Sequence, residues 1–111
     1  MYTPENFNRL CEEFRETEAE IMGFKRTEYA AAEDRLENFR TIAEFTGTTM
    51  EQVALLYLLK HIQSIAVAVE TNNRRWYWGN VDGEGLKQRI ADARNYLLLL
   101  AGCLDERENH K

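Results

Sequence analysis

The chain has 111 residues, 44% of them hydrophobic, so we expect one domain with an ordinary core rather than a disordered chain. With 14 Lys and Arg against 19 Asp and Glu, the net charge is −5, which argues against a general nucleic-acid-binding protein. One proline and six glycines argue against a loop-rich β fold.

The sequence carries no pattern typical of membrane insertion or export. No stretch reaches the roughly 18 consecutive apolar residues of a membrane helix, and the opening MYTPENF does not resemble a signal peptide. We therefore expect a cytoplasmic protein without membrane contact. In that compartment Cys11 and Cys103 are expected to be free thiols, with a single disulfide as the alternative.

Helical periodicity runs through the chain and predicts an all-α, four-helix bundle-like single domain over residues 1–111. The helices are expected at residues 4–22, 30–45, 49–71 and 84–104, with a tail at 105–111. Thr3 is a suitable N-cap before Pro4, and Gly23 is expected to end the first helix. The second helix should end at Gly47, and its apolar stripe consists of Leu36, Phe39, Ile42 and Ala43.

The third predicted helix is apolar on nearly every side and is expected to lie buried at the centre of the bundle. Thr48 and Glu51 form a capping box that predicts its start. Lys60 must reach water or pair with an acid, for example Asp92 of the fourth helix. His61 lies on an apolar side and is interpreted as a core histidine, with a catalytic base as the alternative.

The fourth predicted helix gathers four polar residues on one face at spacings of four, four and three: Glu84, Gln88, Asp92 and Asn95. This face is either solvated, or a ligand site, or an oligomer contact. As a ligand site, Glu84 and Asp92 could together hold a hydrated Mg²⁺, which needs only one or two protein carboxylates. The apolar run that follows predicts a homo-oligomer, with Leu98 and Leu99 lining the contact.

Both tryptophans lie on the expected loop RRWYWGNVDG, next to two arginines. Aromatic rings beside guanidinium groups suit base stacking or a protein partner. The alternative is a loop that only packs Trp76 or Trp78 over the bundle.

Two blocks of the chain together resemble a group of small all-α phage and prophage proteins. The blocks are TEYAAAEDRLENFRTIAEFTG with YLLKHIQSI, and EGLKQRIADARNYLLLLAG. The group is distantly similar to the MazG-like nucleoside-triphosphate pyrophosphohydrolases and to phage nucleotide-modification-associated domains. The resemblance covers about residues 24–104 and implies a nucleotide-related function, in the host cytoplasm if the protein is phage-encoded.

By position, the resemblance implies ligand-binding roles for Tyr29, Asn38, Lys60 and Asn95, and metal-binding roles for Glu84 and Asp92. Gln88 replaces an acid of the family pattern, and Arg89 stands where the pyrophosphohydrolases have a metal-binding glutamate. Fewer acids weaken a Mg²⁺ site, and Arg89 could instead contact a phosphate.

The sequence thus predicts a phage-type protein that binds a nucleotide or related phosphate ligand, with or without Mg²⁺-dependent hydrolysis. Trp76, Trp78 or Tyr29 would stack on the base. The alternative is a non-enzymatic interaction protein that engages a host or defence factor through the loop from Arg74 to Trp78.

Overall fold

The computed structural model describes residues 1–28, 36–71, 76–80 and 83–109, and for residues 21–28, 80, 83 and 84 it describes the backbone alone. Within these residues the fold is all-α, as predicted. It consists of α1 (Pro4–Glu28), α2 (Glu37–Thr46), α3 (Met50–Glu70), β1 (Gly79–Asn80), β2 (Gly83–Glu84) and α4 (Leu86–Asn109). The chain forms two compact units, Met1–Glu33 with α1 and Asp34–Lys111 with the other elements.

Helix α1 begins where the sequence predicts. Asn6 donates its backbone N–H to Thr3 Oγ1 at 3.1 Å, and Thr3 donates its own N–H to Asn6 Oδ1 at 3.0 Å. The predicted end at Gly23 is wrong, because the helix continues to Glu28. A glycine inside a helix costs only about 1 kcal/mol, so it ends a helix only where the following residues also favour another conformation.

Helix α2 uses the predicted stripe. Leu36, Phe39 and Ala43 are buried, and Ile42 packs against them. The helix ends at Thr46, and Gly47 follows with φ +68°, a left-handed conformation that glycine adopts without strain. The described part of this helix begins at Glu37, and the predicted residues 30–35 lie outside the described part of the chain.

The N-cap of α3 is Thr49 and not Thr48 as predicted. Gln52 donates its backbone N–H to Thr49 Oγ1 at 3.2 Å, and Thr49 N–H is donated to Gln52 Oε1 at 3.0 Å. The shift by one residue leaves the Glu51 carboxylate 3.6 Å from Arg107 of α4. The capping box therefore consists of Thr49 and Gln52 rather than Thr48 and Glu51, and Glu51 is free to pair with Arg107 of α4.

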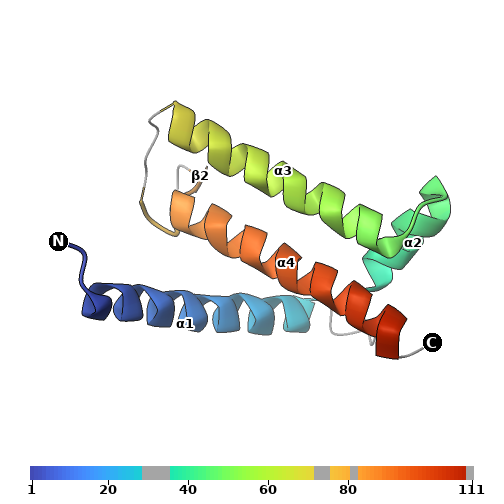
Figure 1. Ribbon diagram of the computed structural model, residues 1–111, viewed down its shortest axis with the longest axis horizontal. Helices are drawn as coiled ribbons and strands as arrows, with labels where there is room; N and C mark the ends of the chain where they lie inside the picture. The colour runs from blue at the N-terminus through green and yellow to red at the C-terminus, as the bar shows by residue number, and fades with distance from the viewer. Residues whose placement is uncertain (29–35, 72–75, 81–82, 110–111) are drawn as a thin grey trace. The chain divides into compact units, whose positions relative to one another are not determined.

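In the second unit, α3 and α4 run antiparallel side by side, and α2 packs across the end where α3 begins (Figure 1). The core between these three helices contains Leu36, Phe39, Ala43, Val53, Ala54 and Cys103. Helix α4 extends past the predicted end at 104 to Asn109. The extra turn is held because Glu106 pairs with Arg40 of α2 and Arg107 with Glu51 of α3.

The expected all-round burial of α3 is wrong. Its inner side is buried, but six of its large apolar side chains are exposed: Leu55, Leu56, Leu59, Ile62, Val67 and Val69. On α4, Leu97 is exposed as well. Of the two residues predicted to line an oligomer contact, Leu98 is exposed, whereas Leu99 packs against the core. Hydrophobic composition alone does not tell which side of a helix finds a neighbour.

Helix α3 is long and apolar enough to cross a membrane by length and composition, contrary to the sequence estimate. An 18-residue window reaches a mean hydropathy of 1.4, and 22% of that window is buried. One such helix is weak evidence for a membrane span, because a mostly buried core helix of a soluble protein passes the same test. Helix α3 is buried only on the side that packs against α2 and α4. The cytoplasmic location stays a prediction.

Replacement of Thr49 by alanine should lower the free energy of unfolding by about 1 kcal/mol, because the backbone N–H of Gln52 loses its acceptor, Thr49 Oγ1. Urea unfolding measures this change. Thr48→Ala is the matched control and should change stability by less than about 0.5 kcal/mol, since Thr48 has no capping role. Equal effects of the two substitutions would contradict the observed cap.

Both cysteines are free thiols, as predicted, and Cys103 is buried. Burial, and then the nearby carboxylates of Glu51 and Glu106, raise the pKa of the Cys103 thiol. The unfolded chain therefore loses this proton first, at a pH of roughly 8.5. The associated stability is present below that pH and should be lost as the pH rises through the folded-state pKa.

Urea unfolding from neutral to alkaline pH tests this linkage. The wild type should lose stability above pH ~8.5. Cys103→Ala should flatten part of that decline, whereas Cys11→Ala, on α1, should leave it unchanged. Parallel curves for all three proteins would show that Cys103 does not contribute.

Candidate functional site

Four rings from three helices meet in the middle of the second unit. Tyr57 and Tyr96 stack with their centroids 5.7 Å apart, and His61 stacks on Tyr96 at 4.7 Å. Phe39 of α2 completes the group, at 6.0 Å from Tyr57 and 6.3 Å from Tyr96. We call these four residues the Tyr96 cluster. Tyr57 and His61 are four residues apart and therefore share one face of α3.

Polar side chains border the Tyr96 cluster. The Lys60 ammonium lies 5.9 Å from the Tyr57 ring centroid, within the range of a cation–π contact. Asp92 lies one turn before Tyr96 and accepts a hydrogen bond from Gln88 Nε2 at 3.1 Å. Asp92 and Gln88 are half-buried, as is Asn95, while Lys60 is exposed. Amide, carboxylate, imidazole and ammonium groups thus lie within a few turns of one another.

The predicted ion pair between Lys60 and Asp92 is wrong. In the described part of the chain, Asp92 has Gln88 as its hydrogen-bond partner, and Lys60 is exposed beside the Tyr57 ring. Because Gln88 precedes Asp92 by four residues on the same helix, it reaches the carboxylate without a tertiary constraint. Lys60 keeps its charge in water, so neither residue is a buried charge that needs the other.

The predicted polar face of the fourth helix is wrong for Glu84, its first residue. Glu84 lies in strand β2, and α4 begins two residues later at Leu86. The short hairpin of β1 and β2 replaces a predicted structureless loop, with Asn80 paired to Gly83. Gln88, Asp92 and Asn95 remain on one side of α4. The helical argument that grouped Glu84 with them does not hold.

A Mg²⁺ site at Glu84 and Asp92 stays a prediction. The structure describes the Glu84 backbone but not its side chain, so the separation of the two carboxylates is not defined. Among the described residues, no three His, Cys, Asp or Glu side chains are grouped to hold a metal ion. Asp92 is the described carboxylate closest in sequence to Tyr96, and it could supply one ligand.

A second group of aromatic and cationic side chains lies where the hairpin meets α4. The Lys87 ammonium is 5.2 Å from the Trp76 ring centroid and 5.9 Å from that of Trp78. Trp76 is 51% exposed. Sequence reasoning found the tryptophans but missed Lys87. A lysine in the first turn after an aromatic loop was the available signal.

The predicted ligand residues do not all come together. Asn38 is exposed on α2, beside Phe39 of the Tyr96 cluster. Arg89 lies in the first turn of α4, and Trp76 and Trp78 precede β1. Lys87 precedes Tyr96 by nine residues, which is about 14 Å along a helix. A small ligand therefore contacts one of these two groups and not both. Tyr29 lies outside the described residues.

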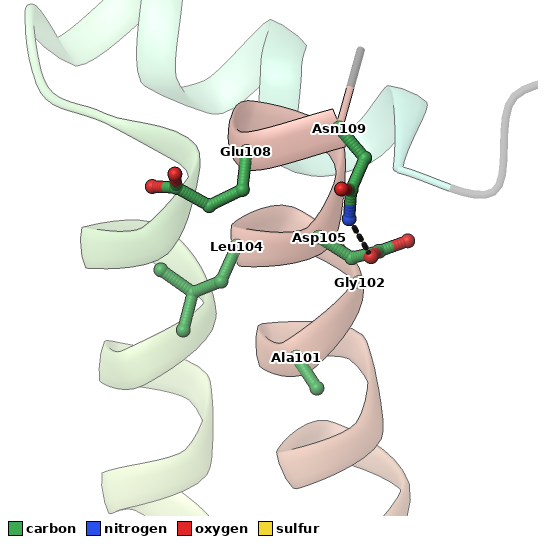
Figure 2. Close-up of a pocket in the computed structure, with 6 residues that line it drawn as sticks. All are labelled: Ala101, Gly102, Leu104, Asp105, Glu108 and Asn109. Atoms are coloured by element: carbon green, nitrogen blue, oxygen red, sulfur yellow. Dashed lines mark hydrogen bonds between the residues drawn. The ribbon is translucent and has the colours of Figure 1, made fainter.

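An open, shallow hollow lies on the last turns of α4. Its lining is Ala101, Gly102, Leu104, Asp105, Glu108 and Asn109, with the Asn109 amide donating a hydrogen bond to Asp105 (Figure 2). The sequence prediction placed half of these lining residues in a tail. No residue predicted to bind ligand lies in this hollow, and its two carboxylates do not favour a phosphate ligand.

Comparison with known protein families, curated proteins and solved structures found no match to this chain. The functional assignment therefore depends on the sequence pattern and on the geometry of the Tyr96 cluster.

The close approach of Gly85 to the Tyr77 and Trp78 backbone can be tested by substitution. Gly85 donates its N–H to the Trp78 carbonyl at 2.9 Å, and an added Cβ would lie 1.9 Å from the Tyr77 carbonyl oxygen. Gly85→Ala should therefore destabilise by about 1–3 kcal/mol and shift tryptophan emission, measured in one urea titration. At Gly79 a Cβ meets nothing within 4 Å, so Gly79→Ala should leave both readouts near wild type. A neutral Gly85→Ala would contradict the close approach.

Proposed function

We propose that this protein binds a nucleotide or a related phosphate ligand beside the Tyr96 cluster. One observation carries the proposal. The separate sequence blocks that resemble the phage group meet at these rings, through Phe39 on α2, His61 on α3 and Tyr96 on α4. Segments about twenty to thirty-five residues apart in the chain thus contribute to one place, which is what a shared ligand site requires.

The chemistry around the rings suits such a ligand. Half-buried aromatic faces can stack on a planar base, and each stacked base contributes about 1–3 kcal/mol in single-stranded nucleic-acid complexes. The exposed Lys60 ammonium can approach a phosphate. The amides of Gln88 and Asn95 can donate to and accept from the base or sugar. The site therefore offers stacking, charge and hydrogen bonding over a short distance.

Binding rather than turnover is the activity we favour. Hydrolysis of a pyrophosphate bond needs metal ions or fixed cations against the developing charge. Here Gln88 stands where the family pattern has an acid, and it occupies an Asp92 oxygen by hydrogen bonding. Asp92 could still join Glu84 in holding Mg²⁺. Fewer carboxylates nonetheless fit sequestration of the ligand better than its cleavage.

A second candidate is a protein-interaction function at the hairpin. The half-exposed Trp76 ring beside the Lys87 ammonium is the observation that favours it. Tryptophan is among the side chains enriched where partner proteins bind. Because both tryptophans of the chain lie just before the hairpin, their fluorescence distinguishes the two candidates. A ligand at the Tyr96 cluster should leave tryptophan emission nearly unchanged.

The ligand proposal is tested by thermal shift against a panel of nucleoside mono-, di- and triphosphates, with and without Mg²⁺. A ligand at a hundredfold excess over its dissociation constant stabilises the native state by about 2.7 kcal/mol. Lys60→Gln should reduce the shift at equal ligand concentration by removing a phosphate contact, while the unliganded protein keeps its stability because Lys60 is exposed.

Arg15→Gln removes the same charge from an exposed position on α1 and is the matched control. It should retain the full ligand-dependent shift. The proposal fails if no nucleotide or inorganic phosphate stabilises the wild type. It also fails if both variants lose the shift equally, since that result would reflect net charge alone. Pyrophosphate release that Asp92→Asn abolishes would establish an enzyme instead of a binder.

A further inference from the structure

The outer face of α3 carries a regular apolar row. Leu55, Leu59, Ile62 and Val69 are 45%, 52%, 47% and 48% exposed, and Ala66 lies between the last two. Their spacings are four, three, four and three residues, the 3.5-residue period of a coiled-coil seam. If this row served only to fold the unit, it would face α2 or α4. Those two helices instead contact the opposite side of α3.

This spacing restricts what can cover the row. Knobs-into-holes packing along a 3.5-residue period requires another helix with the same period, rather than a strand or a small molecule. Helix α3 itself supplies such a row, over about 21 Å from Leu55 to Val69. We propose that the outer face of α3 binds the same face of a second copy of this chain. This inference does not depend on the proposed ligand.

The charges of α3 agree with a second copy as the occupant. The helix has three formally charged side chains besides His61, namely Glu51, Lys60 and Glu70. Glu51 is paired with Arg107 of α4, so the outer side presents one cation and one anion. Two such faces meet without net repulsion, although the whole chain carries −5. A strongly charged partner would find little to match.

The size of the face also suits this arrangement. Leu56 and Val67, both exposed, widen the apolar row on one flank. Pairing through α3 would place two α3–α4 hairpins against each other as a four-helix arrangement, in which coiled-coil-like packing is usual. The inner face of α3 keeps its contacts with α2 and α4, so association requires no refolding of the unit.

Light scattering coupled to size exclusion tests this inference at high micromolar concentration. The wild type should have twice its chain mass of 13.0 kDa, or a higher multiple. Ile62→Glu, at the middle of the row, should return it to 13.0 kDa and raise the dissociation constant by roughly thirtyfold or more. Leu98→Glu, at a 63% exposed position on α4, is the matched control and should keep the wild-type mass.

Circular dichroism shows whether Ile62→Glu keeps its helices, and Val69→Lys at the end of the row gives an independent second variant. A wild-type mass of 13.0 kDa overturns the inference, as does an assembly that both row variants leave intact. An assembly lost in Leu98→Glu but retained in Ile62→Glu would move the contact to α4. Monomers that sediment with phosphatidylcholine vesicles through Ile62 would assign the row to a membrane and also overturn the inference.

Discussion

Helix α3 is apolar around its circumference, and the second unit depends on how its two sides are covered. Val53, Ala54, Leu58 and Ala68 are buried on the inner side. Burial of apolar surface contributes roughly 25 cal/mol per Å², so the packing of α2 and α4 on this side stabilises the unit. The outer side keeps its apolar row in water. The same physical term that folds the unit therefore favours association through the other face.

The inner packing also builds the candidate site. The small side chains of Ala54 and Ala68 let neighbouring helices approach α3 closely, and the Tyr96 cluster fills the space at mid-length. Tyrosine and histidine rings are amphipathic, with apolar faces that pack and polar atoms that reach the rim. The core and the proposed ligand site thus share side chains. Any ligand bound there should stabilise the fold directly, because binding selects the native state.

The two proposals place ligand binding and self-association on different faces of α3. Substitutions on the outer row change exposed side chains and leave the inner contacts in place, whereas changes at Tyr57 or His61 alter core and site together. Lys60 lies between the two faces, beside the Tyr57 ring and next in sequence to Leu59 of the row. Ligand binding and self-association could therefore influence each other at Lys60, while each can be measured on its own.

The sequence by itself determined the all-α class, the apolar stripe of α2 and the end of that helix at Gly47, because these follow from periodicity and backbone preference. It placed the cap of α3 at Thr48 instead of Thr49, since both threonines have a suitable partner three residues on. Only the tertiary structure decided this, and it also decided that Asp92 meets Gln88 rather than Lys60. Such contacts depend on the rotation and depth of packed helices, which no local pattern specifies.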